Sequence, residues 1–128
     1  MTPVTVVYAN RRAYDKGRPY AWVVLVNGIV AGRPKECLVD TGADYLQLPE
    51  IAAREVGLPV TGTLRTVATA SGVVTLNVLS GVVAEIEGHR VTVDLVLTPG
   101  DDGPAILGRQ ALLSALEVGF NRREWLWT

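Results

Sequence analysis

The sequence predicts a single, mostly β domain with one or two short helices. Short runs rich in Val, Ile, Leu and Thr recur along the chain, and segments containing Gly, Pro or Asn separate them, as is typical of β-proteins. With 128 residues, of which 48% are hydrophobic, the chain is long enough to bury one core. The formal net charge is only −1, so we expect no strong electrostatic field that would attract nucleic acid or an anionic membrane.

The first forty residues are expected to contribute several short strands. Asn27-Gly28 is the typical two-residue turn of a β-hairpin, and apolar residues lie on both sides of it. A polar segment rich in Arg, Lys and Gly extends to Pro19, and we expect it to be an exposed loop with solvated charges at Arg11 and Arg12. The strands predicted in this part of the chain cover residues 5–8, 21–26, 29–30 and 37–40.

One short helix is predicted over residues 48–57. Pro49 suits the first turn of a helix, because its missing N–H would have no partner there. Glu50 suits the positive end of the helix dipole, and Gly57 suits the end of the helix.

A long β region is predicted over residues 64–97. Between residues 74 and 87 the even-numbered positions are apolar at most sites, which predicts a strand with one buried face. Gly88-His89 is expected to turn the chain into a second strand, which carries alternate apolar residues over 91–97. The small residues at 70–72 interrupt the region near its start and predict another hairpin turn.

The last thirty residues are expected to hold a loop, a helix and two strands. The composition of residues 98–104 is that of an irregular loop. Apolar residues then lead into Gly108, and leucines at core spacing predict a helix after it. Residues 117–120 and 124–127 are the expected strands, and we expect the tryptophans of the second to be exposed and to form a surface for a partner.

A carboxylate stands at the end of the predicted strand 37–40. Leu38 and Val39 have the apolar character of a buried strand end, and Asp40-Thr41-Gly42 follows them. Because Gly42 can adopt backbone angles that other residues avoid, we expect a tight loop here. A carboxylate beside apolar groups must be hydrogen-bonded, paired or protonated, so Asp40 is the first candidate for a reactive group.

Other candidate reactive groups are weaker. Cys37 could act as a nucleophile with His89 as its base, but a small buried strand residue and a surface turn residue are the expected interpretations. Asp101 and Asp102 could form a metal pair or supply a second acid, yet no Thr/Ser-Gly follows them, and solvated charges are expected. A single Cys and a single His exclude an internal disulfide and make a metal site improbable, so no cofactor or metal is expected.

Residues 37–44, which read Cys-Leu-Val-Asp-Thr-Gly-Ala-Asp, resemble the active-site signature of aspartic proteases of the retroviral type, the retropepsins. Ile106-Leu107-Gly108-Arg109, with the helix after it, resembles the second half of the internal repeat in that family. The resemblance covers roughly residues 20–127, so residues 1–19 are assigned an N-terminal strand and loop and residues 20–128 a protease domain. The predicted helix 48–57, which viral members usually lack, makes the chain look more like cellular or bacterial stand-alone retropepsins, such as the protease domain of the DNA-damage-inducible family.

The resemblance implies a pepsin-like half-barrel that is closed by homodimerisation. It also implies that Arg109 forms a bidentate pair with Asp44, and that the hairpin at 70–72 is a flap over bound peptide. It assigns catalysis to Asp40, Thr41 and Gly42, substrate binding to Ala43, Asp44, Ala70, Ser71 and Gly72, and structural support to Gly108 and Arg109.

The activity implied is that of an aspartic endopeptidase. The chain has one Asp-Thr-Gly, whereas two carboxylates must share a proton, so the resemblance implies a homodimer in which the two copies of Asp40 meet. A non-catalytic dimeric peptide-binding module with the same fold is the alternative, and a protease excised from a retroelement polyprotein is another. The expected partners are a second copy and a peptide or protein substrate, without nucleic acid or membrane.

The N-terminal residues carry no long apolar run. We therefore expect neither a signal peptide nor a membrane span there, and a cytoplasmic protein.

Overall fold

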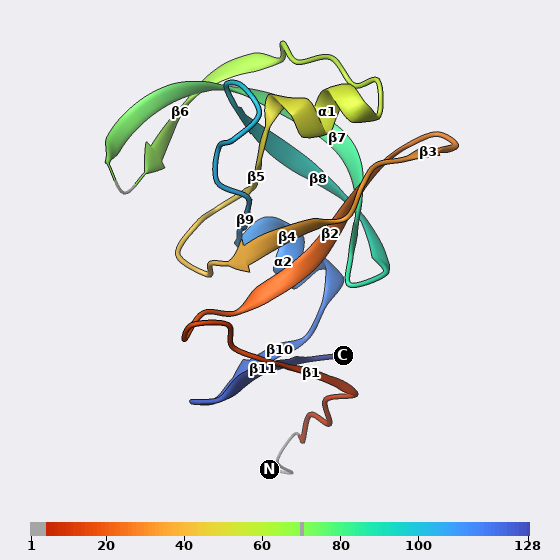
Figure 1. Ribbon diagram of the computed structural model, residues 1–128, viewed down its shortest axis with the longest axis vertical. Helices are drawn as coiled ribbons and strands as arrows, with labels where there is room; N and C mark the ends of the chain where they lie inside the picture. The colour runs from red at the N-terminus through yellow and green to blue at the C-terminus, as the bar shows by residue number, and fades with distance from the viewer. Residues whose placement is uncertain (1–4, 70) are drawn as a thin grey trace.

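The computed structural model describes residues 5–69 and 71–128 of the chain, which form a β-barrel with a small sheet below it (Figure 1). The elements in the N-terminal half are β1 (Asn10–Ala13), β2 (Tyr20–Asn27), β3 (Val30–Ala31), β4 (Lys35–Val39), β5 (Leu46–Pro49) and α1 (Glu50–Glu55). They are followed by β6 (Thr63–Thr69), β7 (Gly72–Ile86), β8 (His89–Thr98), β9 (Ile106–Leu107), α2 (Arg109–Ala115), β10 (Val118–Phe120) and β11 (Glu124–Trp127). The predicted fold class, mostly β with short helices, is confirmed.

The barrel closes within a single chain. β2 pairs with β4 on one side and with β7 on the other. β8 then connects β7 to β5, and β9 connects β5 to β4. The ring of strands therefore needs no second copy, and closure of the molecule by homodimerisation stays a prediction.

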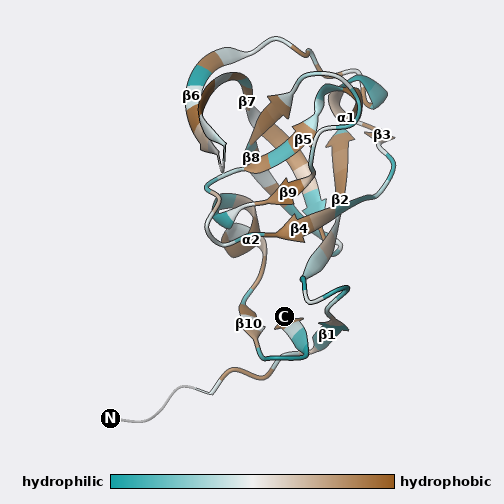
Figure 2. Cartoon of the chain, turned by 60° about the vertical axis from the view of Figure 1, so that its left-hand side comes forward, coloured by the Kyte–Doolittle hydropathy of each residue, from teal (hydrophilic) through white to brown (hydrophobic). Residues whose placement is uncertain are grey.

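Alternate residues of the barrel strands fill its interior. Leu46 and Leu48 of β5 are 0% exposed, and they pack with other aliphatic residues contributed by β2, β4, β7, β8 and β9. In Figure 2 the hydrophobic colour is concentrated on barrel strands such as β2, β4 and β9, whereas β1 is hydrophilic. Burial of this apolar surface supplies the main stabilisation of the fold.

A bulge reverses the alternation of β7 halfway along the strand. Between Leu79 and Val82 the strand contains one residue more than the paired part of β8, and Gly81 there has a φ of +71°. Before the bulge the odd-numbered Leu79 belongs to the core, and after it the even-numbered Val82, Ala84 and Ile86 do. The predicted buried face of even positions is therefore confirmed from Val82 onward, whereas before the bulge Val78 and Leu79 are both buried and Val74 is exposed, because one inserted residue exchanges the two faces.

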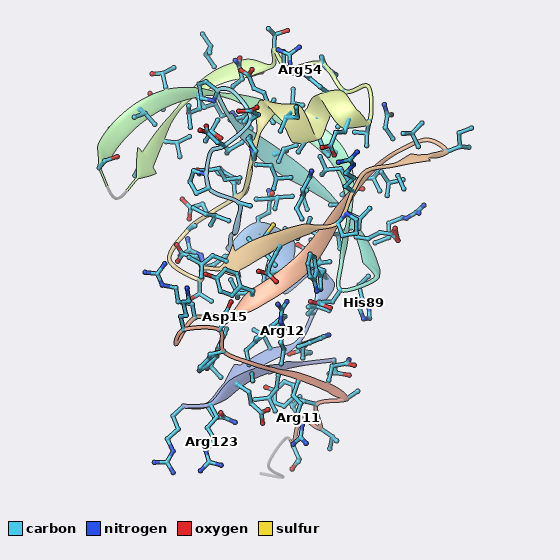
Figure 3. All side chains as sticks on the ribbon, in the orientation of Figure 1. Arg11, Arg12, Asp15, Arg54, His89 and Arg123 are labelled. Atoms are coloured by element: carbon cyan, nitrogen blue, oxygen red, sulfur yellow. The ribbon has the colours of Figure 1, made fainter. Side chains whose placement is uncertain are left out.

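The terminal segments pair with one another in a separate sheet of order β1-β11-β10. Its first strand begins at Asn10, inside the segment predicted to be an exposed loop, while residues 5–8 are not a strand, so both of these predictions are wrong. Arg12 connects this sheet to the barrel (Figure 3), since its Nη2 lies 2.5 Å from Glu36 Oε2 and its Nη1 donates to the Tyr20 carbonyl at 3.2 Å. Pairing with the far end of the chain thus orders a segment whose own composition is that of a loop.

The two tryptophans of β11 are buried. Trp125 is 0% and Trp127 7% exposed, their rings stack with centroids 4.1 Å apart, and Trp125 Nε1 donates to the Tyr20 carbonyl at 2.9 Å. The prediction that they form an exposed partner surface is wrong, because the terminal sheet packs them against the barrel.

Most other predicted elements are confirmed with shifted bounds. Asn27-Gly28 turns β2 into β3, and the helices begin at Glu50 and Arg109. The turn between β7 and β8 lies at Glu87-Gly88, one residue earlier than predicted. Within residues 5–69 and 71–128, no helix has the length and apolar character needed to cross a membrane.

Candidate active site

Asp40 leaves the barrel at the end of a strand that a second strand holds in place. β4 and β9 run parallel, with Leu38 opposite Ile106 and Val39 opposite Leu107. The Asp40 amide then donates to the Leu107 carbonyl at 3.0 Å, which continues this pairing by one residue. Because Val39 faces the core, the alternation of the strand sends the Asp40 side chain to the opposite face.

The loop after Asp40 is closed by its own hydrogen bonds. The Gly42 amide donates to Asp40 Oδ1 at 2.9 Å, and the Ala43 amide donates to the Asp40 carbonyl at 3.1 Å. Gly42 does not have a positive φ, so the predicted need for unusual backbone angles is wrong. A Cβ at this position would lie 3.2 Å from Asp40 Oδ1. Glycine is therefore favoured because little room is left beside the carboxylate.

Gly108 lets the start of α2 approach the loop closely. A Cβ on Gly108 would lie 2.5 Å from the carbonyl oxygen of Tyr45 and 2.6 Å from the backbone nitrogen of Tyr45. Any side chain at position 108 would therefore force the Tyr45 backbone to move. The first amides of the helix, those of Arg109 and Gln110, donate to the carbonyls of Ala43 and Asp44 at 2.9 and 3.0 Å. These amides have no partner inside the helix, so the loop satisfies them and is held by them.

Arg109 binds the same loop through its side chain. Its Nη2 forms a salt bridge with Asp44 Oδ1, and its Nη1 donates to the Thr41 carbonyl at 3.0 Å. The predicted pairing of these two residues is present, but it is not bidentate, because the second guanidinium nitrogen binds the main chain instead. The arginine therefore connects two points of the loop.

Replacing Arg109 with Ala should lower the free energy of unfolding by about 1 kcal/mol or less, because the two side chains of the salt bridge are 49% and 66% exposed and water screens their attraction. The loss should shrink when the salt concentration is raised to about 1 M. Denaturant unfolding at two salt concentrations measures it, with Arg122→Ala in the exposed β10–β11 turn as control. A loss that is unchanged in high salt would contradict an ionic contribution.

A cavity of about 750 Å³ lies over the outer face of the barrel beside Asp40. Its floor comes from the Asp40 loop and from β5, β8 and β9, and its opposite wall comes from the β6–β7 hairpin, which stands out from the barrel in Figure 1. The lining residues that sequence reasoning singled out are Asp40, Gly42, Ala43, Asp44 and Ser71. Of two carboxylates in the lining, Asp44 is bound to Arg109, while Asp40 forms no ion pair within the described residues.

Two of the residues predicted for catalysis or substrate binding do not line the cavity, and a third is outside the described residues. Thr41 is exposed at the tip of the loop, and its carbonyl is the group bound by Arg109. Gly72 begins β7 without lining the cavity, and Ala70 lies outside the described residues. The weaker candidates Asp101 and Asp102 are exposed in the loop before β9.

Sequence reasoning missed three lining residues with polar groups, Tyr45, Gln47 and Thr98. Gln47 lies in β5, between two buried leucines, and the alternation Leu46-Gln47-Leu48 is the signal that could have found it. That signal was hidden because Pro49 and Glu50 favour a helix start, and the helix was therefore predicted two residues too early.

The single cysteine is unsuited to nucleophilic chemistry. Cys37 is buried in the core, and this burial raises the pKa of its thiol to about 12. His89 is exposed in the β7–β8 hairpin (Figure 3), which is separate from the cavity lining. Among the described residues, no group of three or more His, Cys, Asp or Glu side chains could hold a metal ion.

The raised pKa of Cys37 predicts an unreactive thiol and a loss of stability in alkali. The unfolded chain loses this proton above its ordinary pKa of 9.0, whereas the folded chain keeps it until about pH 12. The contribution of the Cys37 thiol to the free energy of unfolding is therefore fully present below pH 9. It is lost as the pH rises toward 12, because the unfolded chain then gains stability by losing the proton. A thiol reagent at pH 8 should label Cys37 only after unfolding, with the free thiol of glutathione as control. Rapid labelling of the folded protein would contradict this prediction.

An Asp-Thr-Gly loop on a β-barrel, held by a Gly-Arg helix start and beside a cavity that a hairpin lines, is the arrangement that the resemblance to aspartic proteases of the retropepsin type implies. Residues 26–114 match the model of the family described as "gag-polyprotein putative aspartyl protease". This match spans more than half of the chain, and the chain therefore belongs to that family. Comparison with curated proteins found no match.

Proposed function

We propose that this chain is an aspartic endopeptidase that acts as a homodimer and hydrolyses peptide bonds with a water molecule activated by two Asp40 carboxylates. The observation that carries the proposal is the position of Asp40. It is a carboxylate without a cation partner among the described residues, at the edge of a cavity large enough for peptide side chains. The family match supports the same activity.

The chemistry needs two carboxylates that share one proton. The ionised carboxylate accepts a proton from water while the water oxygen attacks the carbonyl carbon, and the protonated one gives its proton to the carbonyl oxygen. The tetrahedral intermediate then breaks its C–N bond, as a proton moves to the leaving nitrogen. At close range the two groups titrate as a pair, because both cannot be ionised together.

A second copy of the chain supplies the second carboxylate. The sequence contains one Asp-Thr-Gly, and Asp44, the other lining carboxylate, is bound to Arg109. Thr41 and Gly42 are exposed at the tip of the loop, so they are open to contact by a partner. A two-fold axis beside this loop brings the two Asp40 side chains together, with Thr41 available to hydrogen-bond across it.

The β6–β7 hairpin acts as the flap over the bound peptide. Val67, Ala68 and Val74 of the hairpin line the cavity opposite the Asp40 loop. An extended peptide placed between them can hydrogen-bond to main-chain groups of the hairpin, while its side chains enter the cavity. Closure of the hairpin would exclude water other than the nucleophile.

We further propose that the protein is closer to stand-alone cellular or bacterial members than to viral ones. The support is α1 (Glu50–Glu55), a helix directly after β5 that viral members usually lack. The family description refers to gag polyproteins, so excision from a longer retroelement product is the competing origin. Inspection of the neighbouring reading frames for a capsid or polymerase distinguishes the two.

The proposal is tested by measuring cleavage of a peptide library between about pH 4 and 7 and, in the same samples, the mass in solution. We expect cleavage only at concentrations where the mass is that of two chains. Cleavage by a species with the mass of one chain would overturn the homodimer. No cleavage at any pH, with the dimer present, would favour the non-catalytic peptide-binding module.

A further inference from the structure

The floor of the cavity is the outer face of three neighbouring strands. Gln47 of β5 lies opposite Val96 of β8 on one side and Ile106 of β9 on the other. Because Leu46 and Leu48 face the core, Gln47 points to the opposite face, into the cavity. The carboxamide therefore stands between two apolar side chains, in a position where the pattern of the strand would equally accommodate Val or Ile.

The polar groups of this floor are not satisfied by the protein. The Gln47 carboxamide forms no hydrogen bond with any described residue. The Thr98 hydroxyl is also without a partner in the described part of the chain, but it is buried against Gly103, where an added Cβ would lie 2.2 Å from it, and it is closed to the cavity. The half-buried Gln47 carboxamide is therefore the neutral hydrogen-bonding group of this floor that a ligand in the cavity can reach.

The roof above these groups is apolar. The hairpin residues Val67, Val74 and Leu76 line the cavity from the other side. A side chain that enters this space therefore meets mainly hydrocarbon from the roof, where Ser71 is the polar exception, and reaches the Gln47 carboxamide on the floor. The matching side chain has an apolar stem and a neutral end that both donates and accepts hydrogen bonds.

Ionised side chains match this pocket less well than a carboxamide. Asp40 and Asp44 line the same cavity, so an incoming carboxylate would meet like charge. An ammonium group would be attracted by Asp40, but it has donors only, so it can pair with the Gln47 carbonyl oxygen and not with the Gln47 NH₂ group. A carboxamide supplies one acceptor and two donors, which can form a reciprocal pair with the Gln47 carboxamide.

We propose that the cavity selects peptides in which a side chain flanking the cleaved bond is Gln or Asn, and that Gln47 is the residue that determines this preference. The inference rests on the proposed function, since it takes the cavity as the substrate site. We expect a preference of roughly 10-fold over an apolar side chain of similar size, because a reciprocal carboxamide pair in a partly open site contributes a factor of that order.

The test uses binding, so that it does not depend on cleavage. Peptides with a reduced, non-cleavable bond and with Gln, Asn, Leu, Met or Lys at the flanking positions are titrated into wild type, Gln47→Leu, Gln47→Glu and Thr66→Val. Thr66 is exposed on β6 and does not line the cavity, so its variant is the matched control. Thermal melting verifies that each variant is folded.

We expect wild type and Thr66→Val to bind the Gln or Asn peptides about 10-fold more tightly than the Leu and Met peptides. Gln47→Leu should lose or reverse this preference, and Gln47→Glu should move it toward basic side chains. An unchanged preference in Gln47→Leu, or binding of none of the peptides by wild type, would overturn the inference. A preference that depends on Gln47 in a protein that cleaves no peptide would leave the inference standing and overturn the proposed activity.

Discussion

The Asp40→Asn variant is expected to cleave peptides more slowly than wild type by a factor of at least roughly 10² to 10⁴. The amide cannot accept a proton from water, and with one copy in each chain the substitution removes both acids of the proposed pair. Its Oδ1 can still accept the hydrogen bond from the Gly42 amide, so the loop should keep its geometry. Steady-state kinetics measures the loss, and sedimentation should show an unchanged mass.

Two controls separate loss of chemistry from loss of structure. Asp101→Asn changes an exposed acid outside the cavity and should leave cleavage unchanged. In an equal mixture of wild-type and Asp40→Asn chains that exchange freely, roughly a quarter of the dimers contain two intact acids. Activity per total chain should therefore fall to about a quarter, whereas a fall to one half would show that each chain works alone.

The Gly108→Ala variant should be destabilised by about 1 to 3 kcal/mol or more. The added Cβ would lie 2.5 Å from the Tyr45 carbonyl oxygen, so either β9 and the start of α2 or the Asp40 loop must move. Both shifts weaken the bonds from the Arg109 and Gln110 amides to the loop, and we expect most of the cleavage activity to be lost as well. Thermal melting should show a Tm lower by several degrees for each kcal/mol.

The matched control for this variant is Asp102→Ala, in the loop before β9. Its side chain is exposed, so the substitution should change stability by no more than about 0.5 kcal/mol. If Gly108→Ala had the same Tm as wild type, the close approach of Gly108 to Tyr45 would be unnecessary for the stability of the fold.

The parts of the site that local patterns determine could be predicted. Asp-Thr-Gly after an apolar strand placed Asp40 at a strand end, and the apolar run into Gly108 marked the start of α2. The expected Arg109–Asp44 pair is present, although its second nitrogen binds the Thr41 carbonyl. These features depend on residues close in sequence, or on a family pattern that names both partners.

The features that sequence reasoning missed depend on tertiary pairing. The bulge before Val82 can be recognised only from the register between β7 and β8. Gly81 alone does not reveal that the strand contains an extra residue there. β1 is a strand only because β11 lies beside it, and burial of Trp125 follows from the same sheet. Gln47 was not included in the predicted site, because the residues around Pro49 favour a helix start and the four-residue strand β5 was not predicted.

The closed strand ring has a consequence for how the proposed enzyme would be controlled. A chain that completes its own ring through β2–β7 can remain folded on its own, so assembly and folding become separate events. Dilution would then switch off the proposed peptidase reversibly, without exposing the hydrophobic interior. At low abundance its output would rise with the square of the local chain concentration, so that gathering molecules in one place would be sufficient to activate them.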